Sequence, residues 1–226
     1  MTLPSPVRPR VEFYTEPEGD AIIEWAGAQP GLRRQVGQVL LLTLRYTGLR
    51  LKELVTLRTE EVDLVARRIS LVGKGRKPRV VPIPRPLETV LREYLDEMRP
   101  RLPASTYLFA NLRGNRSLRG RYGARALHNL VVEAGTSADV PGRHHPHRWR
   151  QTYATSLVRR GEDIHVVRRL MGHSNIATTT RYLHLSDSDL LELSTGRSRK
   201  AGASRSEYRR LRVQSLQHQQ RVRRWL

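Results

Sequence analysis

The sequence contains no cysteine, which excludes disulfide bonds and thiolate metal sites anywhere in its 226 residues. Long hydrophobic runs are also missing: the longest, VLLLTL at 39–44, is far too short to cross a bilayer. The first twenty residues lack the apolar segment of a signal peptide. These absences favour a protein of a reducing compartment, and we predict a cytoplasmic protein without a membrane partner.

The sequence has few acidic residues and few lysines. Twenty-one acidic residues face forty-one basic ones, which gives a net charge of +20. The only lysines are Lys52, Lys74, Lys77 and Lys200, so nearly every positive charge is a guanidinium. Arginine binds phosphate in a bidentate way and does not lose its proton. The excess therefore favours a polyanionic partner, with nucleic acid first and an anionic membrane surface a weaker alternative.

Hydrophobic periodicity predicts a mainly α protein with a small antiparallel β-sheet, an α+β fold class. Two β-branched runs, 68–72 and 79–84, flank the loop GKGRKP and predict a hairpin. Helices are predicted at 16–28, 32–46, 51–57, 86–98, 119–134, 147–160, 163–171 and 176–185.

The chain is predicted to contain one compact domain between two less ordered ends. Residues 1–15, with prolines at 4, 6 and 9, are typical of a linker, and the domain is expected to span 16–190. Residues 191–226 form a basic tail with a predicted helix; from Arg197 to Leu226 it holds ten basic residues and one acidic residue. The tail is interpreted equally well as a solvated segment or as a contact with DNA or a neighbouring protomer.

Several polar residues occupy unusual places, although each has a structural explanation by itself. Arg50 follows a Thr-Gly-Leu turn, Lys74 lies between two glycines at the hairpin tip, and His173 follows Gly172. His147 and Arg150 are three residues apart, on one face of a predicted helix. Tyr182 could be an ordinary core tyrosine. Together these side chains supply what a metal-free phosphoryl transfer requires: cations for the phosphate oxygens, a nucleophile and a proton donor.

The motifs TGLRLKEL, GKGRKPRVVPIP, HPHRWRQTYAT and LMGHSNIATTTRYLH resemble the successive motifs of the tyrosine recombinases, the phage integrase family. Their order and intervals match: 24 residues from Arg50 to Lys74, 26 from His147 to His173 and 9 from His173 to Tyr182. The resemblance implies the tyrosine recombinase catalytic-domain fold. It also implies a site-specific recombinase or integrase that cleaves and rejoins DNA without metal, ATP or another cofactor.

The resemblance implies a role for each matched residue. Arg50, Arg150 and His173 would bind the scissile phosphate, and His147 would support the phosphate and the nucleophile. Lys74 would be the general acid toward the 5′-oxygen. Tyr182 would attack phosphorus and form a 3′-phosphotyrosyl bond. Further DNA contacts are predicted at Lys77, Arg79 and Arg148.

The implied partners are double-stranded recombination sites and further copies of the chain, as a dimer on one site and a tetramer in synapsis. The implied setting is a bacterial nucleoid, or the host of a phage or mobile element. Two departures stand out. Trp149 and Gln151 replace the family's usual Leu and His around the arginine, and only about fifteen residues precede the matching pattern. The chain is therefore expected to be either a fragment or an unusually short integrase.

Three alternative functions remain open at this point. A type IB topoisomerase-like enzyme would share the same nicking and religation chemistry. A non-catalytic DNA-binding module would be expected to lack at least one of the six implied catalytic residues, and none is missing. A metal nuclease would use His144, His145 and His147, but no carboxylate completes that set.

Overall fold

The computed structural model describes residues 12–72, 78–111, 120–173, 175, 177–180 and 182. All of these residues belong to one compact unit, Met1–Asp187. The hairpin tip at 73–77, the first eleven residues and the predicted tail helix lie outside the described residues.

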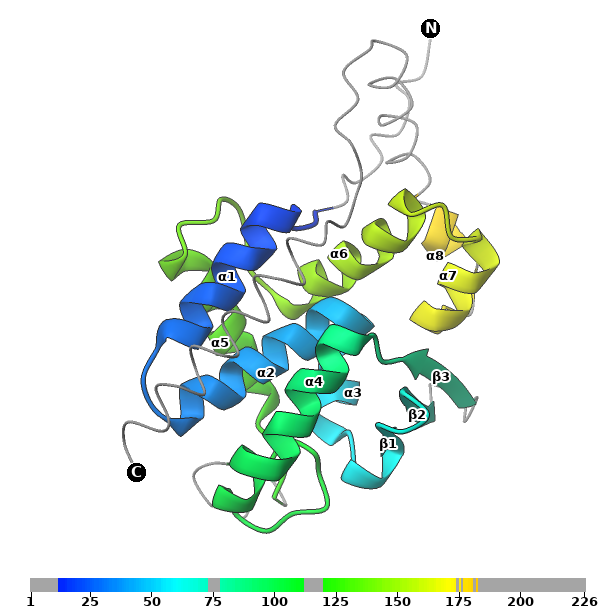
Figure 1. Ribbon diagram of the computed structural model, residues 1–226. Helices are drawn as coiled ribbons and strands as arrows, with labels where there is room; N and C mark the ends of the chain where they lie inside the picture. Colours follow the sequence, from blue (N-terminus) through cyan, green and yellow to red (C-terminus); the bar gives the residue numbers. More distant parts are fainter. Residues whose placement is uncertain are drawn as a thin grey trace, which may run out of the picture. The chain divides into compact units, whose positions relative to one another are not determined.

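The described chain is mostly helical (Figure 1). Its α-helices are α1 Glu16–Ala28, α2 Leu32–Thr47, α3 Leu51–Thr56, α4 Arg85–Glu93, α5 Ala124–Ser137, α6 Pro146–Arg159, α7 Ile164–Met171 and α8 Ala177–Thr180. Short helical turns are η1 Thr59–Glu61, η2 Tyr94–Met98 and η3 Arg99–Arg101. Within the described ranges, no helix combines the length and apolar composition that a membrane span needs.

Helix α2 is central because its sequence is apolar on nearly every side. Val39, Leu40 and Leu41 are buried in succession, and the helix packs against α1, α4, α5 and α6 (Figure 1). It ends at Gly48, which adopts a left-handed conformation with φ 58°. A Cβ atom there would lie 2.4 Å from Cδ1 of Tyr153, so glycine is required for both backbone and packing reasons. This tight turn brings Arg50 next to α6.

A three-stranded antiparallel sheet in the order β1-β2-β3 lies beside the helices. Its strands are β1 Val62–Asp63, β2 Arg68–Val72 and β3 Pro78–Pro82. In β2 and β3 alternate residues are buried, and Ser70 is paired with Val80. The inward positions of β3 are Arg79 and Val81, so an arginine occupies a place where the alternation calls for an apolar side chain.

The buried residues form two hydrophobic clusters. The main cluster involves α1 to α5, the sheet and Trp149 of α6. The second cluster consists of Tyr153, Ala154, Leu157, Val158, Val167, Met171 and Tyr182. Helix α6 contributes to both, so residues near its middle lie between the two clusters.

The structure confirms the predicted fold class, while several predicted boundaries were wrong. Helix α1 has the predicted bounds, but α4 ends at Glu93 and continues as the π-helical turn η2. The helix predicted at 119–134 begins at Ala124 instead. The preceding chain is extended, because Arg121 bridges to Ala110 and the Tyr122 N–H donates to the Phe109 carbonyl at 2.8 Å.

Candidate active site

Arg50 and Arg150 are held side by side by backbone carbonyls. Arg150, which is 3% exposed, donates to the Gly48 carbonyl at 2.6 Å and to the Met171 carbonyl. Arg50 donates from Nη2 to the Gly172 carbonyl at 3.0 Å. Both guanidiniums thus join the turn after α2 to the end of α7, which fixes their positions before any ligand is present.

The electrostatics of this pair favour an anion. Burial, together with the neighbouring Arg50 charge, lowers the pKa of Arg150 to about 10. The Arg150 guanidinium therefore remains charged at neutral pH, although its charge is poorly solvated. Two adjacent cations of this kind are best stabilised by a bound anion with several acceptor oxygens, such as a phosphate diester.

Glu53, which the sequence analysis did not identify, orders the arginines. It accepts hydrogen bonds from the Arg50 backbone N–H at 2.8 Å and from Arg50 Nη1 at 2.9 Å. Arg79 adds a bidentate pair, at 2.9 and 2.7 Å. Burial alone would raise the pKa of Glu53, but hydrogen bonds from Arg79 and Arg50 lower it to about 2. The carboxylate is therefore a permanent anion that ties β3 to α3.

Arg79 and Arg148 were predicted to contact DNA, and the structure gives both a largely internal position. Arg79 is 8% exposed and lies under Gly172, where a Cβ atom would come within 3.1 Å of its Cδ and Nη1. Arg148 donates to the Pro141 carbonyl at 2.9 Å and the Phe13 carbonyl at 3.2 Å, and its guanidinium stacks over Tyr14. These contacts favour structural roles over the predicted DNA contacts, because the guanidiniums are already occupied and covered.

The two predicted active-site histidines lie on different elements. His147 is exposed in the first turn of α6, and its ring stacks against that of His145 with centroids 6.3 Å apart. His173 directly follows the left-handed Gly172 that ends α7, and its Nδ1 is hydrogen-bonded to Thr179 Oγ1 at 3.0 Å. The α7–α8 connection thereby fixes the His173 ring.

Tyr182 is both a packed residue and a neighbour of the arginines. It is only 2% exposed and belongs to the second hydrophobic cluster, and its N–H donates to the Thr179 carbonyl at 3.0 Å. The phenol is nevertheless close enough to Arg150 to raise the pKa of that guanidinium, against the larger effects of burial and Arg50. A core position and a place near the active-site arginines are therefore compatible, because the packed ring lies within electrostatic reach of Arg150.

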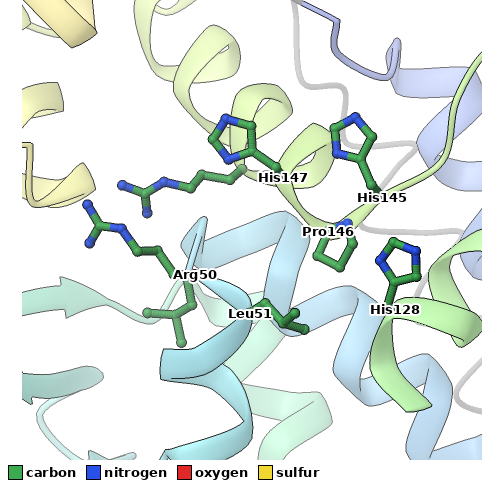
Figure 2. Close-up of a pocket in the computed structure, with 8 residues that line it drawn as sticks. Arg50, Leu51, His128, His145, Pro146 and His147 are labelled. Atoms are coloured by element: carbon green, nitrogen blue, oxygen red, sulfur yellow. The ribbon is translucent and has the colours of Figure 1, made fainter. Parts of the chain in front are cut away.

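A cavity of about 310 Å³ opens beside the arginine pair. Figure 2 shows Arg50 and His147 at one side of it and His128 at the other, with Leu51 and Pro146 between them. Leu49, His145 and Arg150 complete its lining. The described residues thus bring together Arg50, Arg150 and His147, whereas Lys74 and Lys77 lie outside the described residues.

The histidines at 144, 145 and 147 do not form a metal site. His144 Nδ1 is 3.2 Å from the Tyr14 hydroxyl, whereas His145 Nδ1 accepts the Arg148 N–H at 3.1 Å as the N-cap of α6. Nowhere in the described part of the chain are three His, Asp or Glu side chains placed to hold a metal ion. The arrangement gives no support to the metal-nuclease alternative.

A sequence model described as the phage integrase family matches residues 20–189. The chain belongs to this family. It is 35% identical over 179 residues to a tyrosine recombinase of Thermosipho africanus, an alignment that covers 79% of this chain and 59% of that protein. The family assignment agrees with the order of the four motifs and with the arginine pair in the structure.

Solved structures of integrase-family proteins share the fold. The XerA recombinase is 30% identical, with a TM-score of 0.70 over 88% of this chain and 68% of that chain. The XerH recombinase bound to palindromic difH substrate in a post-cleavage complex also has a TM-score of 0.70, at 23% identity, covering 82% of this chain and 53% of that one. The chain spans about three fifths of the length of the curated integrase-family relatives that it matches.

Proposed function

We propose that this chain is the catalytic domain of a site-specific DNA recombinase that works through a covalent 3′-phosphotyrosyl intermediate. The observation that carries the proposal is the pair of carbonyl-anchored guanidiniums, Arg50 and Arg150, with the Tyr182 phenol within electrostatic reach. Membership of the integrase family and the likeness to a recombinase crystallised with its cleaved DNA support it.

In the proposed reaction the arginines hold the scissile phosphate and stabilise the charge that builds on its non-bridging oxygens. Tyr182 gives its phenolic proton to a base, for which the imidazoles His147 and His173 are the proposed candidates, as its oxygen bonds to phosphorus and the bond from phosphorus to the 5′-oxygen breaks. The departing oxygen takes a proton, for which Lys74 is the proposed donor. One phosphodiester replaces another, so rejoining needs no ATP. A phenol, with an ordinary pKa of about 10, is also a good leaving group for the reverse step.

His147 and His173 are proposed to complete the phosphate site from α6 and from the end of α7. The proposed partners are double-stranded recombination sites and further copies of the chain, a dimer on each site and a tetramer in synapsis. The proposed location is the cytoplasm of a bacterium, on the nucleoid or with a mobile element.

The test starts from a duplex selected for binding out of a randomised pool with Tyr182→Phe, which cannot cleave. A suicide version, nicked near the cleavage position so that a short product diffuses away, is then given to the parent chain. The expected result is a protein–DNA adduct that resists denaturant and forms with the parent but not with Tyr182→Phe. Adduct formation by Tyr182→Phe, or none by the parent, would refute the proposal.

A type IB topoisomerase-like activity would use the same chemistry on a single duplex. Incubating two selected duplexes of different length separates the two functions. Recombinant products that join the two lengths indicate strand exchange, whereas relaxation of a supercoiled plasmid without such products indicates a topoisomerase.

A further inference from the structure

The cavity beside the arginine pair extends beyond the groups that the proposed reaction uses. Its volume of about 310 Å³ lies at the lower bound of cavities that hold small ligands, roughly 300 Å³, so it accommodates more than one phosphate group. Arg50, Arg150 and His147 line the end where the scissile phosphate is proposed to bind. The other end, lined by His128 and His145, has no part in the mechanism described above.

The far end of the cavity offers hydrogen-bond donors with a fixed direction. Since His145 Nδ1 accepts the Arg148 N–H, the ring proton of neutral His145 lies on Nε2. Burial and the nearby Arg148 charge lower the pKa of His145, which favours this neutral form. The half-exposed Glu12 forms a long ion pair with this ring and opposes the lowering of its pKa; its Oε2 is 4.0 Å from Nε2, beyond a good hydrogen bond.

His128 places a second imidazole next to the first. It is exposed on α5 and lines the same cavity as His145 (Figure 2). Among the described residues its ring has no hydrogen-bond partner, so its nitrogens are available to a ligand. None of the described residues that line the cavity is acidic, and the first turns of α5 and α6 carry no acidic residue. The far end therefore suits an acceptor-only anion.

We propose that His128 and His145 bind a second backbone phosphate of the DNA, adjacent to the scissile one. The deoxyribose between the two phosphates would lie over Leu51 and Pro146, which form the apolar part of the lining between the two ends. This subsite rests on the proposed function. It would fix the register of the DNA backbone, so that only one phosphate reaches the arginine pair.

The experiment replaces single phosphates by neutral methylphosphonates in the binding-selected duplex, one position at a time on both strands around the cleavage position. Affinity is measured with the Tyr182→Phe chain, and adduct formation with the parent. The test variants are His128→Gln and His145→Ser; serine retains an N-cap acceptor for α6 while it removes the imidazole. His165→Gln is the matched control, because His165 is an exposed imidazole that does not line the cavity.

We expect one methylphosphonate, at a position other than the scissile phosphate, to weaken binding about tenfold, as the loss of a hydrogen bond to a charged group does. The same substitution should have no further effect in His128→Gln or His145→Ser, but its full effect in His165→Gln. If both test variants show the parent's complete pattern, the subsite is wrong. Binding is measured without cleavage, so this outcome is distinct from a parent chain that binds DNA and forms no adduct, which would refute the proposed function instead.

Discussion

Replacing Glu53 by glutamine tests whether one partly buried carboxylate holds the proposed phosphate-binding site together. The change retains the shape of the side chain but removes the charge that faces Arg50 and Arg79. The Arg79 side chain is 6% exposed and that of Glu53 is 16% exposed, so the ion pair is nearly dry. Removing one partner of such a pair costs about 3–5 kcal/mol, because the other charge stays buried without compensation.

The pKa of Glu53 gives an independent estimate of the same energy. Its lowering from 4.5 to about 2 corresponds to about 3 kcal/mol of stability at neutral pH. Because the folded-state pKa lies below the ordinary value, this stability is fully present above pH 4.5 and is lost as the pH falls toward 2. We therefore expect Glu53→Gln to lower the free energy of unfolding by about 3 kcal/mol at pH 7, and the difference from the parent to shrink between pH 5 and pH 2.

The assays are urea unfolding across that pH range and adduct formation at pH 7, in conditions where both proteins are folded. Misplacement of Arg50 should slow adduct formation by about 10²-fold. Glu61→Gln is the control, since Glu61 also accepts a backbone N–H, from Arg58 at 2.7 Å, but at an exposed position. It should change stability by no more than about 0.5 kcal/mol. Equal effects of the two substitutions, or a Glu53→Gln difference that is the same at every pH, would refute the reasoning.

Three other perturbations follow from the site. Arg148→Gln should cost about 2 kcal/mol in urea unfolding, because two partly buried hydrogen bonds from a charged donor are lost; an unchanged stability with weaker DNA binding would favour the predicted DNA contact instead. Lys74→Ala should slow adduct formation about 10²- to 10⁴-fold, and a 5′-bridging sulfur should restore it because a thiolate leaves without a proton; failure of this rescue would exclude Lys74 as the acid. The logarithm of DNA affinity should fall against log salt with a slope of about −0.9 per phosphate neutralised, and a flat plot would assign the +20 charge another role.

The sequence was most informative where a single local pattern decides the structure. The spacing of His147 and Arg150 placed both on α6, and the apolar run of α2 predicted a central helix. The alternation of buried and exposed residues in β3 also indicates that Arg79 points inward. Arg79 and Val81 share one face of β3, and Val81 points inward, so Arg79 had to point inward as well.

Glu53 was missed for a related reason. It stands three residues after Arg50, which is the spacing of a capping box, and it is the only acidic residue in TGLRLKEL. The residues expected to bind a phosphate are cations, so an acidic residue such as Glu53 does not stand out. Its partner Arg79 comes from a strand 26 residues away, and no local pattern pairs the two. The burial of Tyr182 also depends on tertiary packing, because the hydrophobic cluster to which it belongs is built from residues of both α6 and α7.

The candidate site lies at the junction of the two hydrophobic clusters, so its geometry depends on how these clusters sit against each other. Arg150 bonds to the Gly48 carbonyl, beside the main cluster, and to the carbonyl of Met171, which belongs to the second. The second cluster also contains Tyr182, whose backbone N–H bonds to Thr179, the partner of His173. A shift of that cluster would therefore move Tyr182, the proposed nucleophile, together with His173. It would also move the Gly172 carbonyl that accepts a hydrogen bond from Arg50, while Glu53 stays with α3. We therefore expect the alignment of Tyr182 with a bound phosphate to depend on how α7 packs on α6.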